Sequence, residues 1–477
     1  MSALLMTVGW LAAAVAGRIV SGDPDRVVGN IVTDSRSLQA GDFFIALHGA
    51  RFDGHEFVEE ALRRGALGAL VDVGRPFTGR QADEAGREAP PHTPAIVEVG
   101  DTTVALQDLA HAVREATETK VIAITGSAGK TTTKDTIADF LSESYGVVKN
   151  KGNLNNHIGL PLSLLQLRDR PDVAVMELGM NHAGEISALV AISDPDVRVW
   201  TNVGDAHLGF FESADAIADA KAEILEFAEP HDVLVCNADD PRVMARAPRF
   251  AGRVVSFGEA DGATVRATAI EDLGLEGMRA RVVTPIGERM IDTPLLGRGN
   301  LANVLAATAV AVEFGIPLDA IAAHAARLRP SERRGAVHRL RGGVMLVDDS
   351  YNSSPSALKR ALDVIAKEPR AARKVAVLGE MLELGAFSAD LHRDAGRAAA
   401  AAGLDALFVV GGQPARVLGE GAIAAGMAPA TVTFFDESAA AAPAIAAAIR
   451  RGDVVLVKGS RGTRTDVIAD RIAEAFG

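Results

Sequence analysis

The stretch Val121-Ile-Ala-Ile-Thr-Gly-Ser-Ala-Gly-Lys-Thr-Thr-Thr-Lys134 decides how the middle of this chain folds. Its first four residues are apolar and predict a buried strand, and the small residues of 126–129 predict a tight turn. Lys130 and Thr131 come next, and apolar residues at helical spacing over 137–141 predict a helix. A strand, a small-residue turn, Lys-Thr and a helix together indicate a phosphate-binding loop.

Such a loop has a direct physical rationale. Glycines let backbone N–H groups point at a polyphosphate, and the N-terminus of the helix adds partial positive charge. The usual spacing, G-x-x-x-x-G-K-S/T, would need a glycine at position 124, where this chain has Ile124. An ordinary glycine turn before a helix is the alternative, but strand, helix and Lys-Thr all agree, so nucleotide binding is favoured. The nucleotide-binding residues predicted here are Gly126, Ser127, Gly129, Lys130, Thr131 and Thr132.

Length and composition narrow the class of protein. A chain of 477 residues is too long for one hydrophobic core, and three domains are a reasonable expectation. With 48% hydrophobic and 23% charged residues, the composition is that of a soluble globular protein. The net charge of −13, without a basic block, argues against a nucleic-acid partner.

Cysteine content and the N-terminus indicate a cytoplasmic protein. Cys236 is the only cysteine, which excludes an intrachain disulfide, and its apolar neighbours predict a thiol buried in a strand. Residues 2–16 carry no charge, but they lack the basic start of a signal peptide and are too short to span a bilayer. We therefore expect residues 9–16 to form a short core helix, with no membrane insertion.

The order of predicted elements divides the chain into three α/β domains. Residues 1–100 mix short strands and helices in a small N-terminal domain, interrupted by a polar stretch over 75–94 that predicts a surface loop. Residues 101–329 alternate strands and helices, which predicts a central, mostly parallel ATPase-type sheet around the phosphate loop. Residues 330–477 predict a second doubly wound, Rossmann-like unit, without the G-x-G-x-x-G of dinucleotide binding.

Ligands of doubly wound sheets collect at the carboxyl ends of strands, so polar residues there are candidates. Glu177 ends one predicted central strand and suits Mg²⁺ as a carboxylate ligand. His207 follows another strand, and from the residues alone it is as consistent with a structural histidine as with a metal ligand. Lys221 lies on a predicted helix, where a solvated surface charge is the ordinary interpretation.

Four further polar clusters stand out. Thr33-Asp-Ser-Arg36 fits a turn with a cap, and Asn153-Leu-Asn-Asn-His157 is dense in groups that could bond a phosphorylated or hydroxylated ligand. Asp348-Asp-Ser-Tyr-Asn352 and Lys458-Gly-Ser-Arg461 each follow a predicted strand of the third domain. Both therefore occupy positions where ligand sites form.

Taken together, these pieces resemble the Mur ligases, the ATP-dependent amide-forming enzymes of peptidoglycan precursor synthesis. The likeness covers essentially the whole chain, in order, and the shortened loop with Ile124 is part of it. Four motifs resemble the family member that joins D-Ala-D-Ala to UDP-MurNAc-tripeptide: Thr33-Asp-Ser-Arg36, Met180-Asn-His-Ala-Gly-Glu-Ile186, Asp348-Asp-Ser-Tyr-Asn-Ser-Ser-Pro355 and Leu378-Gly-Glu-Met-Leu-Glu-Leu-Gly385.

The resemblance implies roles for particular residues. Lys130, Lys221 and His207 are the expected catalytic residues, and Lys221 is expected to be carbamylated by CO₂. The family often has His before the first asparagine of its adenine segment, where this chain has Gly299. The implied ATP contacts outside the loop are Asn300, Asn303, Arg334 and Asp349, and the implied Mg²⁺ ligands are Thr131, Glu177, His207 and carbamylated Lys221. The implied substrate residues are Thr33, Asp34, Ser35, Arg36, Asn155, Asn156, Asn181, His182, Tyr351 and Asn352.

The resemblance also implies a reaction. ATP phosphorylates the carboxylate of UDP-MurNAc-tripeptide, and the amine of D-Ala-D-Ala attacks the acyl phosphate, in a monomeric enzyme of the cytoplasm. Two other functions stay open: a sister Mur ligase that adds one amino acid to the muramoyl dipeptide, and a phosphate-loop ATPase or kinase without ligase activity. An inactive scaffold is disfavoured because Lys130, Thr131, Glu177, His207 and Lys221 occur together.

Overall fold

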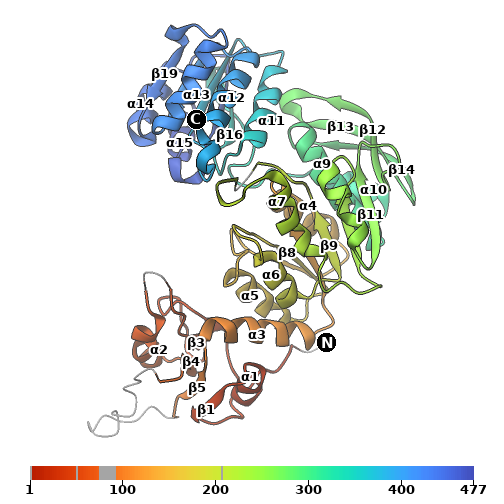
Figure 1. Cartoon of the computed structure of the whole chain (residues 1–477), viewed down its shortest axis with the longest axis vertical. Helices are drawn as coiled ribbons and strands as arrows, with labels where there is room; N and C mark the ends of the chain where they lie inside the picture. The colour runs from red at the N-terminus through yellow and green to blue at the C-terminus, as the bar shows by residue number, and fades with distance from the viewer. Residues whose placement is uncertain (1–2, 50–51, 75–92, 206–207) are drawn as a thin grey trace. The chain divides into compact units, whose positions relative to one another are not determined.

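The computed structural model describes residues 3–49, 52–74, 93–205 and 208–477, which form three β-sheets with helices between their strands (Figure 1). The chain divides into two compact units. One contains residues 1–123, 145–179 and 185–196, and the other contains residues 124–144, 180–184 and 197–477. The domain boundaries expected after residues 100 and 329 stay predictions. Within the described residues, no helix combines the length and apolar character needed to cross a membrane.

The N-terminal sheet has five strands in the order β1-β5-β4-β3-β2, parallel except for the β1–β5 pair. The core helix expected over 9–16 is confirmed as α1, whose first turn is capped by the Thr7 hydroxyl accepting from the Trp10 N–H. The loop expected over 75–94 lies almost wholly outside the described residues. The elements are α1 (Val8–Ala14), β1 (Arg18–Ser21), β2 (Ile31–Val32), β3 (Phe43–Ile45), α2 (Val58–Arg63), β4 (Gly68–Asp72), β5 (Ala95–Val99) and α3 (Thr102–Glu115).

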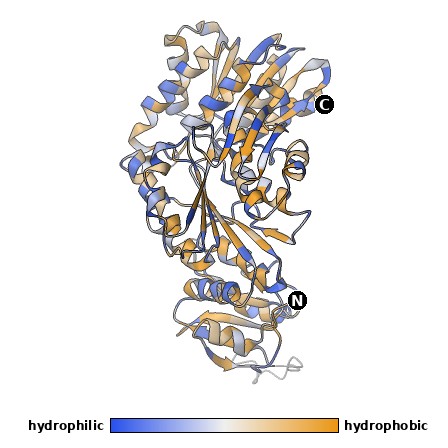
Figure 2. Ribbon diagram, turned by 90° about the vertical axis from the view of Figure 1, so that its right-hand side faces the viewer, coloured by the Kyte–Doolittle hydropathy of each residue, from blue (hydrophilic) through white to orange (hydrophobic). Residues whose placement is uncertain are grey.

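The central sheet has nine strands in the order β14-β13-β12-β11-β10-β9-β6-β8-β7. Its inner strands are buried along their whole length, which is why their sequences are almost continuously apolar, and Figure 2 shows strands of this kind largely in the hydrophobic colour. The elements up to β10 are β6 (Lys120–Thr125), α4 (Lys130–Leu141), β7 (Val147–Lys149), α5 (Gly159–Leu164), β8 (Val173–Glu177), α6 (Glu185–Ser193), β9 (Val197–Trp200), α7 (Ala214–Ala222) and β10 (Val233–Asn237).

The mostly parallel character of this sheet is confirmed, but its far edge was not anticipated. β12, β13 and β14 pair antiparallel as a ribbon. Buried and exposed residues alternate along β13, as expected for a strand with one face in water. The remaining elements are α8 (Pro241–Met244), β11 (Arg253–Gly258), β12 (Val265–Asp272), β13 (Met278–Thr284), β14 (Gly287–Thr293), α9 (Gly297–Glu313) and α10 (Leu318–Ala325).

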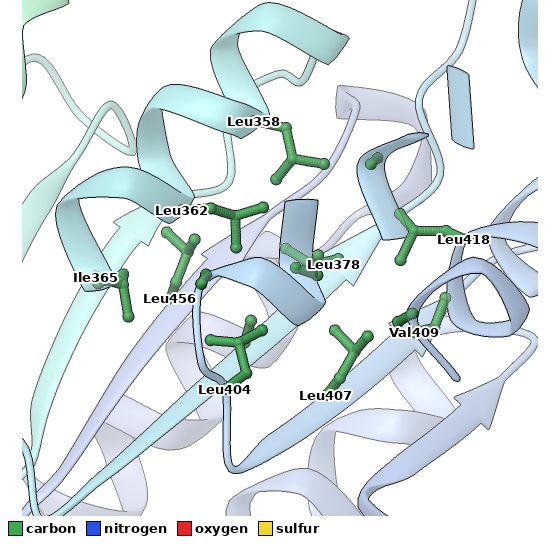
Figure 3. Packing of buried hydrophobic residues seen from close by; sticks show 14 of the residues in the cluster. Leu358, Leu362, Ile365, Leu378, Leu404, Leu407, Val409, Leu418 and Leu456 are labelled. Carbon is green, nitrogen blue, oxygen red and sulfur yellow. The ribbon is translucent and has the colours of Figure 1, made fainter. Parts of the chain in front are cut away.

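The C-terminal sheet confirms the expected doubly wound unit. Its order is β15-β16-β20-β17-β18-β19, and every pair except β15–β16 is parallel. One buried cluster joins the sheet to α11, α12 and α13, as Figure 3 shows for Leu358 and Leu362 above Leu378 and Leu456. A second cluster lies under α14 and α15. The elements are β15 (Ala336–Arg339), β16 (Met345–Asp349), α11 (Pro355–Ala366), β17 (Arg373–Gly379), α12 (Ser388–Ala401), β18 (Ala406–Val410), α13 (Gln413–Ala424), β19 (Val432–Phe435), α14 (Ser438–Ala448), β20 (Asp453–Lys458) and α15 (Asp466–Phe476).

Candidate active site

The predicted phosphate loop connects the buried strand β6 to α4, which begins at Lys130. Gly129 precedes the helix in the left-handed conformation, with φ of 85°, and no side chain caps the helix. A Cβ at Gly129 would lie 2.2 Å from Asn303 Oδ1, so both the backbone angle and the available space require glycine. The first-turn N–H groups of α4 have no intrahelical acceptor, which makes this helix start suited to an anion.

The end of β9 holds the loop in place. Thr201 Oγ1 donates to the Ala128 carbonyl at 2.8 Å. The Asn202 carboxamide bonds both polar groups of Ala128: Nδ2 donates to the carbonyl at 2.9 Å, and Oδ1 accepts from the N–H at 3.0 Å. The Ser127 N–H donates to the Asn202 carbonyl at 3.0 Å. The loop is therefore built before any ligand arrives, which lowers the cost of binding.

Sequence reasoning missed Thr201 and Asn202 as loop supports, although it singled out the segment that contains them for the sake of His207. Their position directly after a strand was the available signal. His207 itself, predicted as catalytic and metal-binding, lies outside the described residues.

The two asparagines predicted near adenine lie in the first turns of α9. Asn303 packs against Gly129, accepts from Thr133 Oγ1 at 3.3 Å and donates to Asn300 Oδ1 at 3.1 Å. Asn300 in turn donates to the Leu296 carbonyl at 2.9 Å. The structure thus brings the predicted adenine segment against the phosphate loop, as a shared nucleotide site requires.

Lys221 on α7 is buried, with only 1% of its surface exposed, so the interpretation as a solvated surface lysine is wrong. Burial lowers the pKa of Lys221 well below its usual value, the nearby charge of Lys130 lowers it further, and Glu223 opposes the shift. Within the described part of the chain, no hydrogen bond or ion pair compensates its ammonium group. Burial and the nearby charge of Lys130 therefore both disfavour the protonated form of Lys221.

Lys130, unlike Lys221, has a hydrogen-bond partner in the phosphate loop. Its Nζ donates to the Gly126 carbonyl at 2.7 Å, across the loop it follows. This contact keeps the ammonium over the loop, where the phosphates of a nucleotide would lie.

Glu177, the predicted Mg²⁺ ligand, ends β8 and is 4% exposed. Asn155 Nδ2 donates to its Oε1 at 2.8 Å, and the Asn150 carboxamide bonds its backbone N–H and carbonyl, each at 3.0 Å. Asn156, by contrast, accepts from the Gly159 N–H at 2.9 Å at the start of α5. The substrate roles expected for Asn155 and Asn156 stay predictions, and the observed contact of Asn155 is with the carboxylate of Glu177.

The expected metal set has only one carboxylate that the structure describes. Throughout 3–49, 52–74, 93–205 and 208–477, no three His, Cys, Asp or Glu side chains gather as a metal-binding group. Thr131 offers a hydroxyl, and Lys221 becomes an oxygen donor only as a carbamate. Hydroxyl, carboxylate and carbamate oxygens are nevertheless the donors that Mg²⁺ prefers.

The N-terminal cluster has the geometry of a turn. Asp34 and Arg36 are both exposed and form an ion pair of 2.7 Å, and Ser35 between them is buried. Hydrogen bonds from the Arg36 side chain and backbone lower the pKa of Asp34 to about 2. Asn181 and His182 are exposed, and the His182 ring lies 5.1 Å from that of Phe210.

A second polar cluster forms where β16 and β20 end. Lys458 Nζ donates to Asp349 Oδ2 at 2.6 Å and to the Asn352 carbonyl at 3.0 Å. The Arg334 guanidinium lies 3.9 Å from the centre of the Tyr351 ring. Arg461 Nη1 donates to the Tyr351 hydroxyl at 3.3 Å. The structure therefore gathers all four predicted residues of this domain with Lys458 and Arg461, to which no role had been given.

Three family models match consecutive parts of the chain. Residues 27–120 match the Mur ligase family catalytic domain, residues 124–311 the Mur ligase middle domain, and residues 333–461 the Mur ligase glutamate ligase domain. Each of the three sheets thus lies largely within the span of one model.

Individual relatives match over most of their length. The chain is 32% identical to a UDP-N-acetylmuramoyl-tripeptide–D-alanyl-D-alanine ligase of Bacillus subtilis over 98% of both chains, and 37% identical to the Escherichia coli enzyme of the same name over 80% of this chain and 81% of that one. Among solved structures, a MurF from Acinetobacter baumannii has a TM-score of 0.87 at 32% identity, covering 99% of this chain and all of that one. A Thermotoga maritima MurF ligase in complex with ADP has a TM-score of 0.79 at 29% identity, covering 94% and 97%.

Proposed function

This chain belongs to the Mur ligase family, and we propose that it is the ATP-dependent ligase that joins D-Ala-D-Ala to UDP-MurNAc-tripeptide. The observation that carries the proposal is the preformed phosphate loop, held by Thr201, Asn202 and Asn303 in a chain whose full-length relatives bear that activity in their names. It binds ATP, as expected of a family with a member solved in complex with ADP.

The reaction has two steps. A carboxylate oxygen of the tripeptide attacks the γ-phosphorus of ATP, the bond to the β,γ-bridging oxygen breaks, and ADP leaves. The amine of D-Ala-D-Ala then attacks the carbonyl carbon of the acyl phosphate, the C–O bond to phosphate breaks, and the amine gives up a proton. Lys130 and the loop N–H groups neutralise charge that develops on the transferring phosphoryl group. The protein's contribution is thus placement and charge stabilisation.

Mg²⁺ fits the donors that this chain presents. Thr131 and Glu177 would hold it, together with His207, and bound Mg²⁺ would neutralise phosphate charge. We place Asn155 as the residue that fixes the Glu177 carboxylate toward the ion, because its carboxamide donates to that carboxylate at 2.8 Å.

Lys221 is proposed to become a carbamate. Its neutral amine would attack the carbon of CO₂ and release a proton, which converts a buried cation into an anionic oxygen donor. Its burial, its lowered pKa and the lack of a compensating partner in the described residues support this step. Buried lysines with an ion-pair partner would resist it, because they stay protonated.

The substrate contacts follow from the family likeness. We assign Thr33, Asp34, Ser35 and Arg36 to the uridine end, and Tyr351 and Asn352 to the incoming dipeptide. Arg334 and Asp349 are assigned to ATP, and Asn181 and His182 to the muramoyl peptide. We also place the enzyme in the cytoplasm, because Cys236 is its only cysteine.

A substrate-competition assay tests the proposal. ADP and phosphate release are measured with UDP-MurNAc-tripeptide and ATP, adding D-Ala-D-Ala, meso-diaminopimelate or lysine in separate reactions. We expect release and a product heavier by one dipeptide only with D-Ala-D-Ala. Release that requires a free amino acid and the muramoyl dipeptide would favour the sister ligase. Release without any carboxylate substrate would favour a simple ATPase.

A further inference from the structure

Arg360 on α11 occupies the space that a side chain at Gly299 would need. A Cβ built on Gly299 would lie 3.0 Å from Arg360 Cδ and 3.2 Å from its Nε, which is tighter than ordinary van der Waals contact. A side chain at position 299 would therefore press on the Arg360 side chain, which glycine leaves undisturbed.

The neighbourhood of that volume is the nucleotide site. Gly299 lies in the first turn of α9, one helical turn (about 5.4 Å) before Asn303. Asn303 packs directly against Gly129 of the phosphate loop. Because the family resemblance implies that Asn300 and Asn303 lie near the adenine, Gly299 adjoins the expected nucleoside end.

The Arg360 guanidinium is not committed to a protein partner. Across the described ranges of the chain, no ion pair or hydrogen bond reaches it, and Asp349 and Asp205 act on it only through their longer-range charge. A guanidinium carries five N–H donors and a planar face that stacks on aromatic rings. Such a group beside a nucleotide site has the chemistry to hold a purine base.

We propose that Arg360 contacts the nucleoside end of the bound adenine nucleotide, in the place of the side chain that Gly299 lacks. The contact is a specificity-determining one, made from the domain that also carries Asp349 and Tyr351. It rests on the proposed function, since it requires ATP as the substrate of the phosphate loop.

Binding of ADP and of inorganic tripolyphosphate to the full-length protein, measured by calorimetry, tests the proposal. For Arg360→Ala we expect ADP to bind about 10-fold more weakly and tripolyphosphate to bind as in the unmodified protein. Lys359→Ala is the matched control, because Lys359 is the exposed neighbour on the same helix, and its ADP affinity should be unchanged. Equal weakening of both ligands would overturn the assignment to the nucleoside end.

A second pair of variants tests the exchange itself. Gly299→His alone should weaken ADP binding, because its side chain meets Arg360. In the Arg360→Ala background, Gly299→His should recover most of the lost ADP affinity. An Arg360→Ala variant that binds ADP within twofold of the unmodified protein would overturn the inference. If the unmodified protein binds neither ligand, the proposed function fails first.

Discussion

Two buried lysines, Lys458 in the C-terminal sheet domain and Lys221 in the central one, differ in whether a carboxylate compensates their charge. Lys458 ends β20 of the C-terminal sheet and is 3% exposed, and it bonds Asp349 and the Asn352 carbonyl. Lys221 on α7 is 1% exposed and has no such compensation in the described residues. A carboxylate partner stabilises a buried ammonium, whereas desolvation without such a partner disfavours the charged form. Since both lysines are buried, the presence or absence of a carboxylate partner is what distinguishes their expected roles.

The largest expected effect on activity is that of replacing a third lysine, Lys130. Lys130 lies over the phosphate loop, bonded to the Gly126 carbonyl. We expect Lys130→Ala to lower kcat about 1,000-fold or more, because the transferring phosphoryl group loses its compensating charge. The rate of ADP formation under saturating substrates measures this. Lys359→Ala serves as the exposed control, and a near-normal kcat in Lys130→Ala would remove the loop from the mechanism.

Chemical rescue of activity tests the difference between Lys221 and Lys458. Lys221→Ala should lower activity about 100-fold, and added short-chain carboxylic acids should restore part of it, because a free carboxylate can replace the carbamate. Lys458→Ala should also lose activity but gain nothing from the acids, since its role is that of a paired cation. Equal rescue of both variants, or no loss in Lys221→Ala, would contradict the distinction.

The next effect concerns the carboxylate of Glu177, the proposed Mg²⁺ ligand. Asn155→Ala should raise the Mg²⁺ concentration needed for half-maximal activity about 10-fold, because Glu177 loses the donor that orients it. Lys151→Ala is the control from the same segment, since Lys151 is exposed and no role is assigned to it. A Mg²⁺ titration compares them, and an equal response of both variants would point to general loosening of the segment.

The smallest effect concerns His392, a buried histidine of α12. The Met381 N–H donates to His392 Nε2 at 3.0 Å, and burial lowers the pKa of His392. Below pH about 6.5 the unfolded chain therefore binds a proton that the folded chain resists, so stability falls as the pH falls. Between pH 7.5 and 5.5 we expect the Tm of the unmodified protein to fall about 2 °C more than that of His392→Gln. Parallel decreases would exclude His392 as the cause.

Much of the fold was predictable because buried parallel strands are nearly continuous apolar runs. β8 and β10 are runs of this kind, and both are buried along their whole length. The antiparallel ribbon of β12–β14 was not anticipated, although residues 284–287 read Thr-Pro-Ile-Gly, a turn signal next to the alternating pattern of β13. Local pattern also could not show that Lys221 is buried, since burial there depends on elements far away in the sequence.

Some residues of the candidate site could also be predicted from the sequence, and others could not. The phosphate loop is a contiguous motif, so its residues were predictable from the chain alone. The supports at Thr201, Asn202 and Asn155 are not, because each acts through a hydrogen bond to a residue at least 22 positions away. Gly299 is a further example. Its proximity to Arg360, which belongs to a different sheet domain, cannot be predicted from the sequence around either residue.

The central claim, that the phosphate passes to a peptide carboxylate, is tested most directly by positional isotope exchange. ATP labelled with ¹⁸O in the β,γ-bridge is incubated with the enzyme and UDP-MurNAc-tripeptide, without D-Ala-D-Ala. Reversible acyl phosphate formation lets the β-phosphate of ADP rotate, so the label should spread into non-bridging positions only when the tripeptide is present. Exchange without any carboxylate substrate, or no exchange with the tripeptide in an enzyme that turns over, would contradict the claim.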